Sequence, residues 1–303
     1  MKRVVSVSLG SSTRDKRVEI EILGEPFVVE RIGTNGDMTR FKALVEELDG
    51  RVDAIGMGGI DLYLRAGDRR YQIRDAARLI AGVHRTPVVD GGGIKTSWEK
   101  YLILDYLPTQ AGVSFAGRRV LLVSSVDRYG MAEAFTQAGA ETLFGDFYFA
   151  LGIPVPMRRL GTVRLLAAAM LPVVTKLPFQ MLYPTGAKQE RTTPKYPQLF
   201  RWAEVVAGDF HFIRRYMPDD LAGKTIFTQT ITPEDRAALG HRGAAALITA
   251  APDIEGRSFA TNVLEGIVVA LSGRRSEDLT PDDFVQWMLR AGFRPRVERL
   301  AAS

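Results

Sequence analysis

The chain has 303 residues, a net charge of +5 at pH 7, 46% hydrophobic residues and 25% charged residues, which is ordinary for a globular protein and enough for two domains. It has no cysteine, which excludes disulfides, thiolate metal sites and cysteine nucleophiles and leads us to expect a reducing, cytoplasmic location. No Lys/Arg run interleaved with aromatic residues occurs, which argues against nucleic-acid binding. The few dispersed histidines argue against a metal site.

The first third of the chain predicts a mixture of strands and helices. Residues 3–9 alternate polar and β-branched apolar side chains, which is typical of a strand. Further strands or hairpins are expected over 17–33, 52–59, 61–73 and 86–93, and helices over 39–48, 74–81 and 96–107. The segment 108–119 is rich in loop-forming residues and indicates a domain boundary.

The remainder of the chain alternates continuous apolar runs with amphipathic segments. Strands are expected over 119–125, 141–146, 203–209, 224–230 and 244–252, and helices over 131–139, 232–240, 259–273 and 281–292. This alternation predicts a doubly wound, Rossmann-like parallel sheet. We therefore predict an N-terminal α/β substrate domain over 1–112 and a nucleotide-binding domain over 113–303, with an apolar insert at about 150–200.

The insert contains the most apolar stretch, Leu165–Pro184. Its longest uncharged run, Leu165–Thr175, is shorter than the roughly 20 residues that span a bilayer. We predict no spanning membrane segment and interpret the stretch as a buried helix followed by a packed loop. A homodimer face through 160–184 or a monotopic membrane contact remains an alternative.

Gly-Asp-Phe occurs twice, at 145–147 and 208–210, each time after an apolar run. In doubly wound sheets ligands bind beyond the carboxyl ends of the strands, and an acid at the end of the second strand binds the adenosine ribose. Asp146 lies 22 residues after Ser124, which fits that spacing, although the loop "SSVDRYG" is not G-x-G-x-x-G. Because a carboxylate repels a 2′-phosphate, NAD is favoured over NADP. The predicted cofactor-binding residues are Ser124, Ser125, Asp127, Arg128, Gly130, Asp146, Asp209 and Thr228.

A second group of candidate residues lies in the first domain. In "VVDGGGIKTSWEK" a strand leads to Asp90, three glycines turn the chain, and Lys95 enters a helix. A lysine beside a carboxylate can hold a hydroxyl and transfer its proton, so Lys95 and Asp90 are the predicted catalytic residues, with Asp90 orienting Lys95. The polar strand ends that we expect to bind substrate are Ser11, Ser12, Arg14 and Asp61.

Several of these segments, among them "TPVVDGGGIKTSWE", "VSSVDRYGMAEAF" and "EGRSFATNVLEG", resemble a bacterial family labelled quinate 5-dehydrogenase. The resemblance implies NAD(P)-dependent oxidation of a cyclic polyol acid, and a domain order similar to that of the shikimate dehydrogenase fold. The chain lacks the Asn-Val-Thr-x-Pro-x-Lys and Asn-Thr-Asp motifs, so the resemblance transfers no catalytic residue.

The sequence thus predicts an NAD(P)-dependent oxidoreductase that acts on a small hydroxy acid, such as quinate or shikimate, in a cleft between two domains. Two alternatives stay open. One is a nucleotide-sugar or other transferase that uses the same sheet edge, which the missing glycines favour. The other is a noncatalytic ligand-binding protein.

Overall fold

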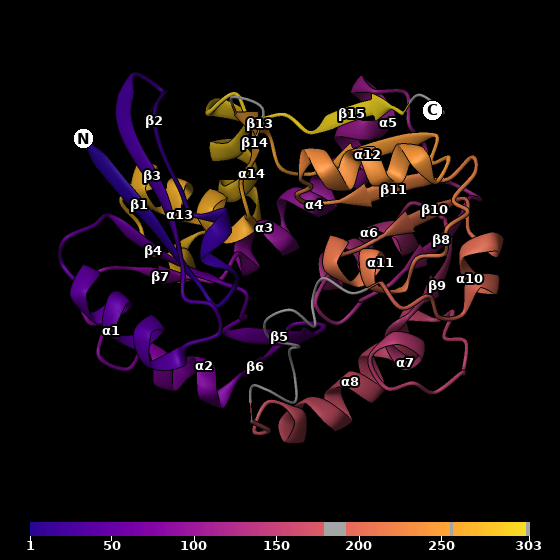
Figure 1. Ribbon diagram of the computed structural model, residues 1–303, viewed down its shortest axis with the longest axis horizontal. Coiled ribbons are helices and arrows are strands. Elements are labelled where there is room, and N and C mark those ends of the chain that lie inside the picture. The colour runs from indigo at the N-terminus through magenta and orange to yellow at the C-terminus, as the bar shows by residue number, and fades with distance from the viewer. Residues whose placement is uncertain (179–191, 255–256, 301–303) are drawn as a thin grey trace.

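A computed structural model describes residues 1–178, 192–254 and 257–300 and contains two separate main sheets (Figure 1). The predicted fold class is confirmed: an N-terminal α/β unit is followed by a doubly wound, mostly parallel sheet. The first sheet has the order β2-β3-β1-β4-β7, with only β2 antiparallel. Its strands are β1 (Lys2–Ser8), β2 (Lys16–Ile22), β3 (Glu25–Gly33), β4 (Ala54–Gly58) and β7 (Val88–Val89).

The alternating pattern of β1 supplies both faces of the first sheet. Val5 and Val7 pack with the helices α1 (Met38–Leu48) and α2 (Arg74–Leu79) in one apolar cluster. Val4 and Ser6 point to the other face, where α13 (Thr261–Ser272) lies. Asn262 Nδ2 of α13 donates to Ser6 Oγ over 2.7 Å. A strand with a polar residue on its buried face therefore has a polar partner from a distant part of the chain.

The second sheet has the order β15-β12-β11-β10-β8-β9, in which only β15 is antiparallel. Its strands are β8 (Arg119–Leu122), β9 (Glu141–Phe144), β10 (Val205–Ala207), β11 (Thr225–Thr228), β12 (Ala246–Thr249) and β15 (Arg296–Arg299). Strand order reverses at β8, which lies between β9 and β10, so the edge beyond β8 and β10 is the switch point of the sheet. The sequence patterns had not predicted β15.

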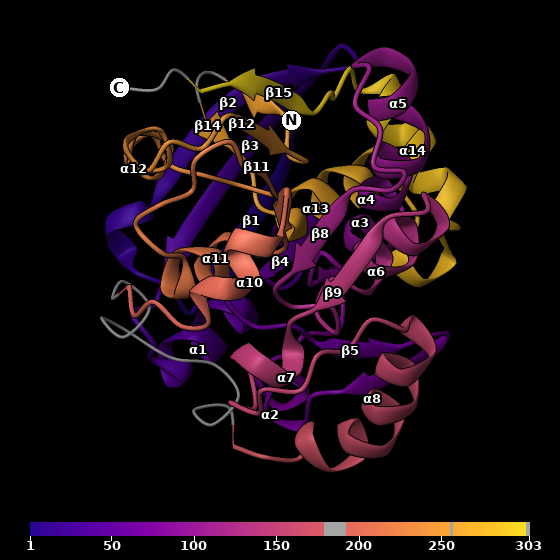
Figure 2. The ribbon, with the colours of Figure 1, turned by 90° about the vertical axis from the view of Figure 1, so that its right-hand side faces the viewer.

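Helices cover both faces of the second sheet (Figure 2). They are α6 (Tyr129–Gln137), α7 (Asp146–Phe149), α8 (Leu160–Val174), α10 (Pro197–Trp202), α11 (Phe210–Tyr216) and α12 (Pro233–His241). Thr232 caps α12 as its sequence predicts, because its side chain accepts a hydrogen bond from Asp235 N.

A helical connection joins the two sheets. It begins within the expected glycine loop and consists of α3 (Gly92–Thr96), α4 (Trp98–Tyr101), the π-helical turn η2 (Leu102–Tyr106) and α5 (Leu107–Gln110). Trp98 is fully buried, and its Nε1 donates to Ala250 O of the second sheet over 2.8 Å. A single apolar cluster runs from the first sheet through this connection into the second sheet.

The chain crosses back to the first sheet near its C-terminus. After β12 come the small hairpin β13 (Asp253–Ile254) and β14 (Arg257–Ser258), then α13, the turn η4 (Ser276–Asp278) and α14 (Pro281–Arg290). Gly56 of β4 lies so close to α13 that an added Cβ would stand 2.9 Å from Asn262 Nδ2. The segment 261–272, which the sequence grouped with the second domain, thus covers the first sheet, because its apolar face completes that core.

The apolar insert packs against a hairpin of the first unit. The hairpin consists of β5 (Tyr63–Ala66) and β6 (Arg69–Gln72). A short 3-10 turn, η1 (Ser12–Arg14), follows β1 in the same unit but is not part of this hairpin. Ala167 and Leu171 of α8 pack with Ala66 of β5 in a small cluster, and α8 lies beside β5 in both ribbon views. The expected buried helix is therefore only half buried: Leu165 is 70% exposed and Val173 64%.

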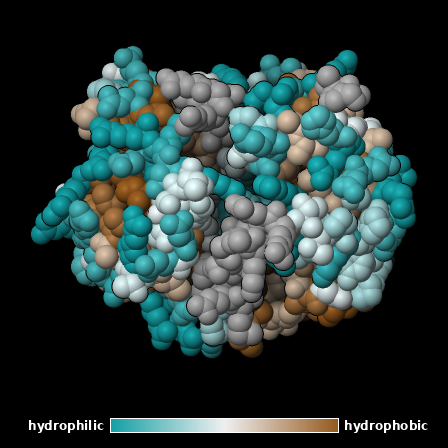
Figure 3. Space-filling view, in the orientation of Figure 1, coloured by the Kyte–Doolittle hydropathy of each residue, from teal (hydrophilic) through white to brown (hydrophobic). Residues whose placement is uncertain are grey.

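The exposed side of the insert contributes apolar surface along the lower edge of the molecule in Figure 3, in the region of α7 and α8. None of the helices within the described ranges has the length and apolar character needed to cross a membrane. The homodimer face at 160–184 stays a prediction, and its last residues, 179–184, lie outside the described residues.

Candidate functional site

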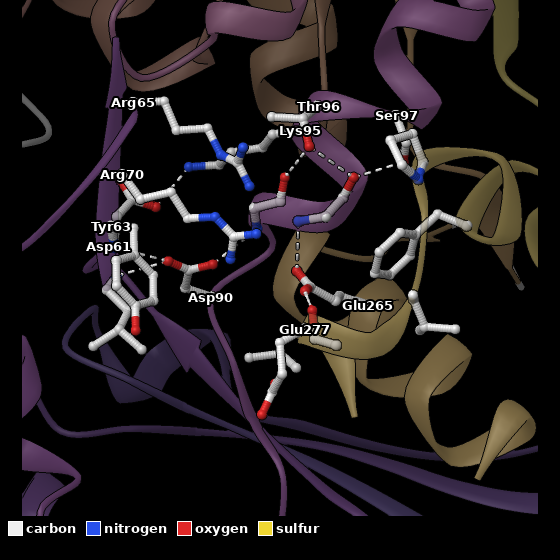
Figure 4. A pocket seen from close by; sticks show the side chains of 18 of the residues that line it. Asp61, Tyr63, Arg65, Arg70, Asp90, Lys95, Thr96, Ser97, Glu265 and Glu277 are labelled. Atoms are coloured by element: carbon white, nitrogen blue, oxygen red, sulfur yellow. Dashed lines mark hydrogen bonds and ion pairs between the residues drawn. The ribbon is translucent and has the colours of Figure 1, made fainter. Parts of the chain in front are cut away.

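A cleft of about 1310 Å³ lies between the two units. Its walls come from the β5–β6 hairpin, from α3 and α4, from the beginning of α6, and from the segment that includes α13 and α14. Charged side chains dominate the part of the cleft in Figure 4. Because each wall comes from a different stretch of the chain, the cleft exists only in the folded protein.

Lys95 lies at the junction of the two units. Its Nζ donates to Asp61 Oδ1 over 2.6 Å and to Asp127 Oδ1 over 2.7 Å. Asp61 follows β4 of the first sheet, and Asp127 follows β8 of the second. All three side chains line the cleft, although that of Lys95 is only 11% exposed. The structure thus brings Lys95 next to Asp127, just beyond the carboxyl end of β8.

The protonation states of this cluster differ from the expected ones. A lysine that acts as a general base needs a lowered pKa. Burial alone lowers the pKa of Lys95, but Asp127 and Asp61 outweigh burial and raise it. The pKa of Asp127 is lowered, because Lys95 and Arg128 outweigh its burial. Burial raises the pKa of Asp61 to about 7, although Lys95 opposes that change. Of these two groups, Asp61 is therefore the one whose pKa moves toward neutral pH.

Arg128 forms a second cluster directly behind the first one. It pairs with Glu99 Oε1 at 2.8 Å, with Asp209 Oδ2 at 3.1 Å and with Asp127 Oδ2 at 3.3 Å. The Glu99 side chain has no exposed surface, and burial raises its pKa to about 7 even though Arg128 opposes the change. Together the two clusters form one chain of charges from Asp61 to Asp209 that joins the first unit, the helical connection and the second unit.

Asp90 does not orient Lys95. Its Oδ2 accepts hydrogen bonds from Leu62 N at 2.7 Å and Tyr63 N at 3.1 Å, and its Oδ1 accepts from Gly92 N at 2.8 Å. It therefore fastens the start of the β5–β6 hairpin to the start of α3. The expected partnership fails because Lys95, five residues further on, is turned by the helix toward Asp61 and Asp127.

The Asp146 carboxylate holds the loop after β8 in place through hydrogen bonds. Its Oδ2 accepts a hydrogen bond from Ser125 N and its Oδ1 accepts one from Val126 N, both at 3.0 Å, and Ser125 Oγ bonds the same carboxylate. Burial raises the pKa of Asp146, and these hydrogen bonds oppose the change. In a dinucleotide site a phosphate would need such loop N–H groups. Here the protein's own carboxylate takes them, so this loop does not fit a pyrophosphate, and NAD binding stays a prediction.

The remaining predicted cofactor residues are buried near the same edge. Ser124 lies just after β8, and Thr228 is the last residue of β11. Their hydroxyl oxygens, Ser124 Oγ and Thr228 Oγ1, are buried without a hydrogen-bond partner. Gly130 allows close packing: an added Cβ would stand 2.3 Å from Lys95 O. The glycine therefore lets α6 approach α3.

The predicted substrate residues of the first turn lie apart from the cleft, because none of Ser11, Ser12 and Arg14 lines it. Ser11 caps the turn η1 by accepting a hydrogen bond from Thr13 N. Ser12 N donates to Asn35 Oδ1 over 2.8 Å, and Asn35 Nδ2 donates to Ser12 Oγ over 3.0 Å. These side chains satisfy local turns, whereas Asp61, the fourth predicted substrate residue, does line the cleft.

Among the charged residues of the cleft that sequence reasoning missed are Arg65, Arg70 and Glu265. Arg65 and Arg70 pair directly across the β5–β6 hairpin, which lies within the range 61–73 where the sequence predicts strands or a hairpin. Glu265 is 2% exposed, and burial raises its pKa to about 7. A single acid inside the apolar run of α13 was the available signal for it. Within the described ranges, no group of three or more His, Cys, Asp or Glu residues could hold a metal ion.

These features define a two-domain α/β protein with a charged cleft between its sheets. The chain belongs to the family described as Domain of unknown function (DUF8754), which matches residues 93–300. Residues 3–90 match a second description, Domain of unknown function (DUF8753). A comparison with curated proteins found no match.

Among solved structures the likenesses are low. A galactofuranose binding protein is 12% identical, with 96% of this chain and 99% of that chain covered and a TM-score of 0.36. A substrate-binding protein of a sugar ABC transport system from Bordetella parapertussis 12822 is 11% identical, with 92% and 82% covered and a TM-score of 0.34. A phosphoglycerate oxidoreductase from Vibrio cholerae o395 is 11% identical, with 75% of each chain covered and a TM-score of 0.23. Scores this low say nothing about the ligand of this chain.

Proposed function

We propose that this protein is an enzyme that binds a small hydroxylated molecule in the cleft and removes or returns a proton at one of its hydroxyl groups. The observation that carries this proposal is the position of Lys95 Nζ, 2.6 Å from Asp61 and 2.7 Å from Asp127, on the wall of a large cleft. A general base must lie within hydrogen-bond reach of the proton it takes. Asp61 and Lys95 both line the space that such a ligand would occupy.

The two groups have complementary roles in this proposal. Lys95 keeps its proton, because its pKa is raised by Asp127 and Asp61 against the effect of burial, so its ammonium group donates to the ligand oxygen and stabilises negative charge that develops there. Asp61, with a pKa of about 7, accepts the hydroxyl proton in its ionised form. Asp127 stays ionised and holds the ammonium group in place.

The oxidation of quinate, shikimate or a related hydroxy acid is the finer form of this proposal, and it rests on the family resemblance. A nicotinamide cofactor would supply the hydride acceptor, but the loop after β8 gives its binding no support, because Asp146 already takes the N–H groups of Ser125 and Val126. Acid–base chemistry at a hydroxyl is also part of isomerisation, dehydration and group transfer. The transferase alternative therefore shares the same two groups.

The test is ligand turnover with variants of the two groups. Purified protein is incubated with quinate, shikimate and a panel of polyols, with and without NAD or NADP, and products are followed by mass spectrometry and nicotinamide absorbance. We expect Asp61→Asn and Lys95→Met to abolish turnover, since general acid–base groups typically contribute about 10²–10⁴-fold. Asp68→Asn is the matched control, because Asp68 also lines the cleft but lies on the exposed hairpin turn.

The pH profile separates catalysis from mere structural support. Wild-type turnover should rise as the pH increases through about 7, as Asp61 loses its proton. If Asp61→Asn keeps full activity, or if the wild-type rate is flat across this range, the proposed role of Asp61 is wrong.

A further inference from the structure

We propose that Arg65 and Arg70 form a binding site for an oxyanion, a carboxylate or a phosphate group, on the cleft side of the β5–β6 hairpin. The proposal deepens the proposed function, since it assigns a charged group to the ligand of the same cleft. Both side chains line the cleft, and Figure 4 shows both reaching from the hairpin toward α3.

The first argument is the direct opposition of two like charges. Arg65 and Arg70 are partners in the register of the hairpin, so their Cβ atoms lie about 4.5–5.5 Å apart. Like charges in this arrangement destabilise a hairpin. Burial, and after it the charge of Arg70, lower the pKa of Arg65, while Asp90, Glu265 and Glu133 at longer range oppose the change. An anion between the two guanidinium groups would remove that cost and form charge-assisted hydrogen bonds with both.

The second argument is the lack of an acidic partner. Neither guanidinium forms a salt bridge with a carboxylate among the described residues, although the protein pairs many of its other arginines. The acids of the same cleft have other donors. Asp90 accepts three backbone hydrogen bonds, Glu265 accepts from Gly93 N and Ser276 Oγ, and Glu133 pairs with Lys100 at 3.4 Å.

The third argument is that the hairpin is held in place from behind. Ala66 packs with Ala167 and Leu171 of α8, and Arg74 N, just after the hairpin, donates to Thr175 O at the end of α8 over 2.9 Å. Asp90 holds the start of the hairpin through Leu62 N and Tyr63 N. The two arginines therefore project from a fixed support, and a bound anion need not order the backbone that presents them.

The anion would lie in the cleft that also contains Asp61 and Lys95. This arrangement gives the ligand two recognised ends: an oxyanion on the hairpin, and a hydroxyl group at the junction of the two units. Arginine forks match the geometry of carboxylate and phosphate oxygens, so the shared chemistry of the two groups is what the site selects.

The test uses inorganic phosphate and acetate as probes of the intact protein. Calorimetry and thermal unfolding measure binding, and phenylglyoxal modification followed by peptide mass spectrometry reports on each arginine separately. We expect phosphate or acetate to protect Arg65 and Arg70 from modification. Arg65→Met and Arg70→Met should each weaken binding about tenfold, the loss of one charge-assisted hydrogen bond. The stronger of the two anions identifies the source of the ligand charge.

Arg69→Met is the matched control. Arg69 pairs with Ala66 across the hairpin and is exposed, so its side chain leaves from the opposite face, and we expect its loss to change anion affinity less than about twofold. Equal losses in all three variants, or no protection of Arg65 and Arg70, would overturn the proposal. Lys95→Met should retain phosphate binding, so a failure of the acid–base proposal leaves this result unchanged.

Discussion

Arg128 lies buried at the junction of the two units, whereas Arg65 and Arg70 line the cleft, and their surroundings are opposite in charge. Arg128 is 3% exposed and contacts three carboxylates, those of Glu99, Asp127 and Asp209. Arg65 and Arg70 form no salt bridge with any described carboxylate. A buried guanidinium that pairs with three carboxylates stabilises the fold, whereas one that lies beside a like charge and has no salt bridge is available to a ligand. The number of carboxylate partners therefore distinguishes Arg128, which we assign to the stability of the fold, from Arg65 and Arg70, which we assign to ligand binding.

The largest expected effect is the loss of stability on removal of the Arg128 guanidinium. Arg128→Met leaves Glu99 buried without its partner and removes a contact of both Asp127 and Asp209. Breaking a buried pair on one side costs about 3–5 kcal/mol, and we expect the free energy of unfolding in urea to fall by that amount. The double variant Arg128→Met/Glu99→Gln should recover part of the loss. A change below about 1 kcal/mol, the usual worth of a surface pair, would show that Arg128 is no more structural than Arg65.

The pH dependence of stability tests the acids around Arg128. The folded-state pKa of Glu99 is raised, by burial, to about 7. Its contribution to stability is therefore fully present below the unfolded-state pKa of about 4.3 and is lost as the pH rises through about 7. One such group accounts for about 4 kcal/mol of lost stability across this window. Glu99→Gln should remove that share, so the free energy of unfolding should fall less steeply from pH 5 to about pH 7.

Asp61 and Glu265 have pKa values raised in the same direction by burial, so Glu265→Gln should flatten the profile in the same sense. A wild-type protein whose stability increases over this pH range would contradict the assignment. The carboxyl of Asp127 titrates below this window because its pKa is lowered.

The packing of α8 against the hairpin that presents Arg65 and Arg70 can be weakened by a single substitution. Leu171 of α8 is 4% exposed and packs with Ala66 of the hairpin, whereas Leu165 on the same helix is 70% exposed. Leu171→Ala should lower the free energy of unfolding by about 2–3 kcal/mol, and it should also weaken phosphate binding, because the hairpin loses part of its fixed position. Leu165→Ala should change both quantities little. If Leu171→Ala alters stability alone, the insert does not position the arginine pair.

The smallest expected effect is an increase in the free energy of unfolding, whereas the preceding variants lower it. Without an anion, Arg65→Met should raise the free energy of unfolding by about 0.2–1 kcal/mol, because it relieves the repulsion from Arg70. Excess phosphate should reverse the order of stability of the two proteins, since only the wild type binds it well. Thermal unfolding with and without phosphate measures both quantities. A destabilised Arg65→Met protein in the absence of phosphate would mean that Arg65 already has a stabilising partner.

Much of the architecture follows from local patterns in the sequence. The alternation in β1, the turn residues of the β5–β6 hairpin and the cap at Thr232 each act over a few residues, and each appears where its pattern predicts. Lys95 was predicted as a site residue because a glycine run and a helix entrance present it. Its partners were harder to predict, because Asp61 and Asp127 lie 34 and 32 residues away from it in the chain.

The sequence by itself determined the α/β class and the parallel second sheet, since periodicity, glycines and strand ends are local signals. The roles of Lys95 and Asp61 stay predictions, although the structure places both side chains on the wall of the cleft. Only the tertiary structure decided that α13 returns to cover the first sheet and that Asp146 holds its own loop. It also decided that Arg128 pairs with three carboxylates while Arg65 and Arg70 form no salt bridge among the described residues. The physical reason is that the charge and pKa of a side chain depend on burial and on neighbours from distant segments, which no spacing along the chain encodes.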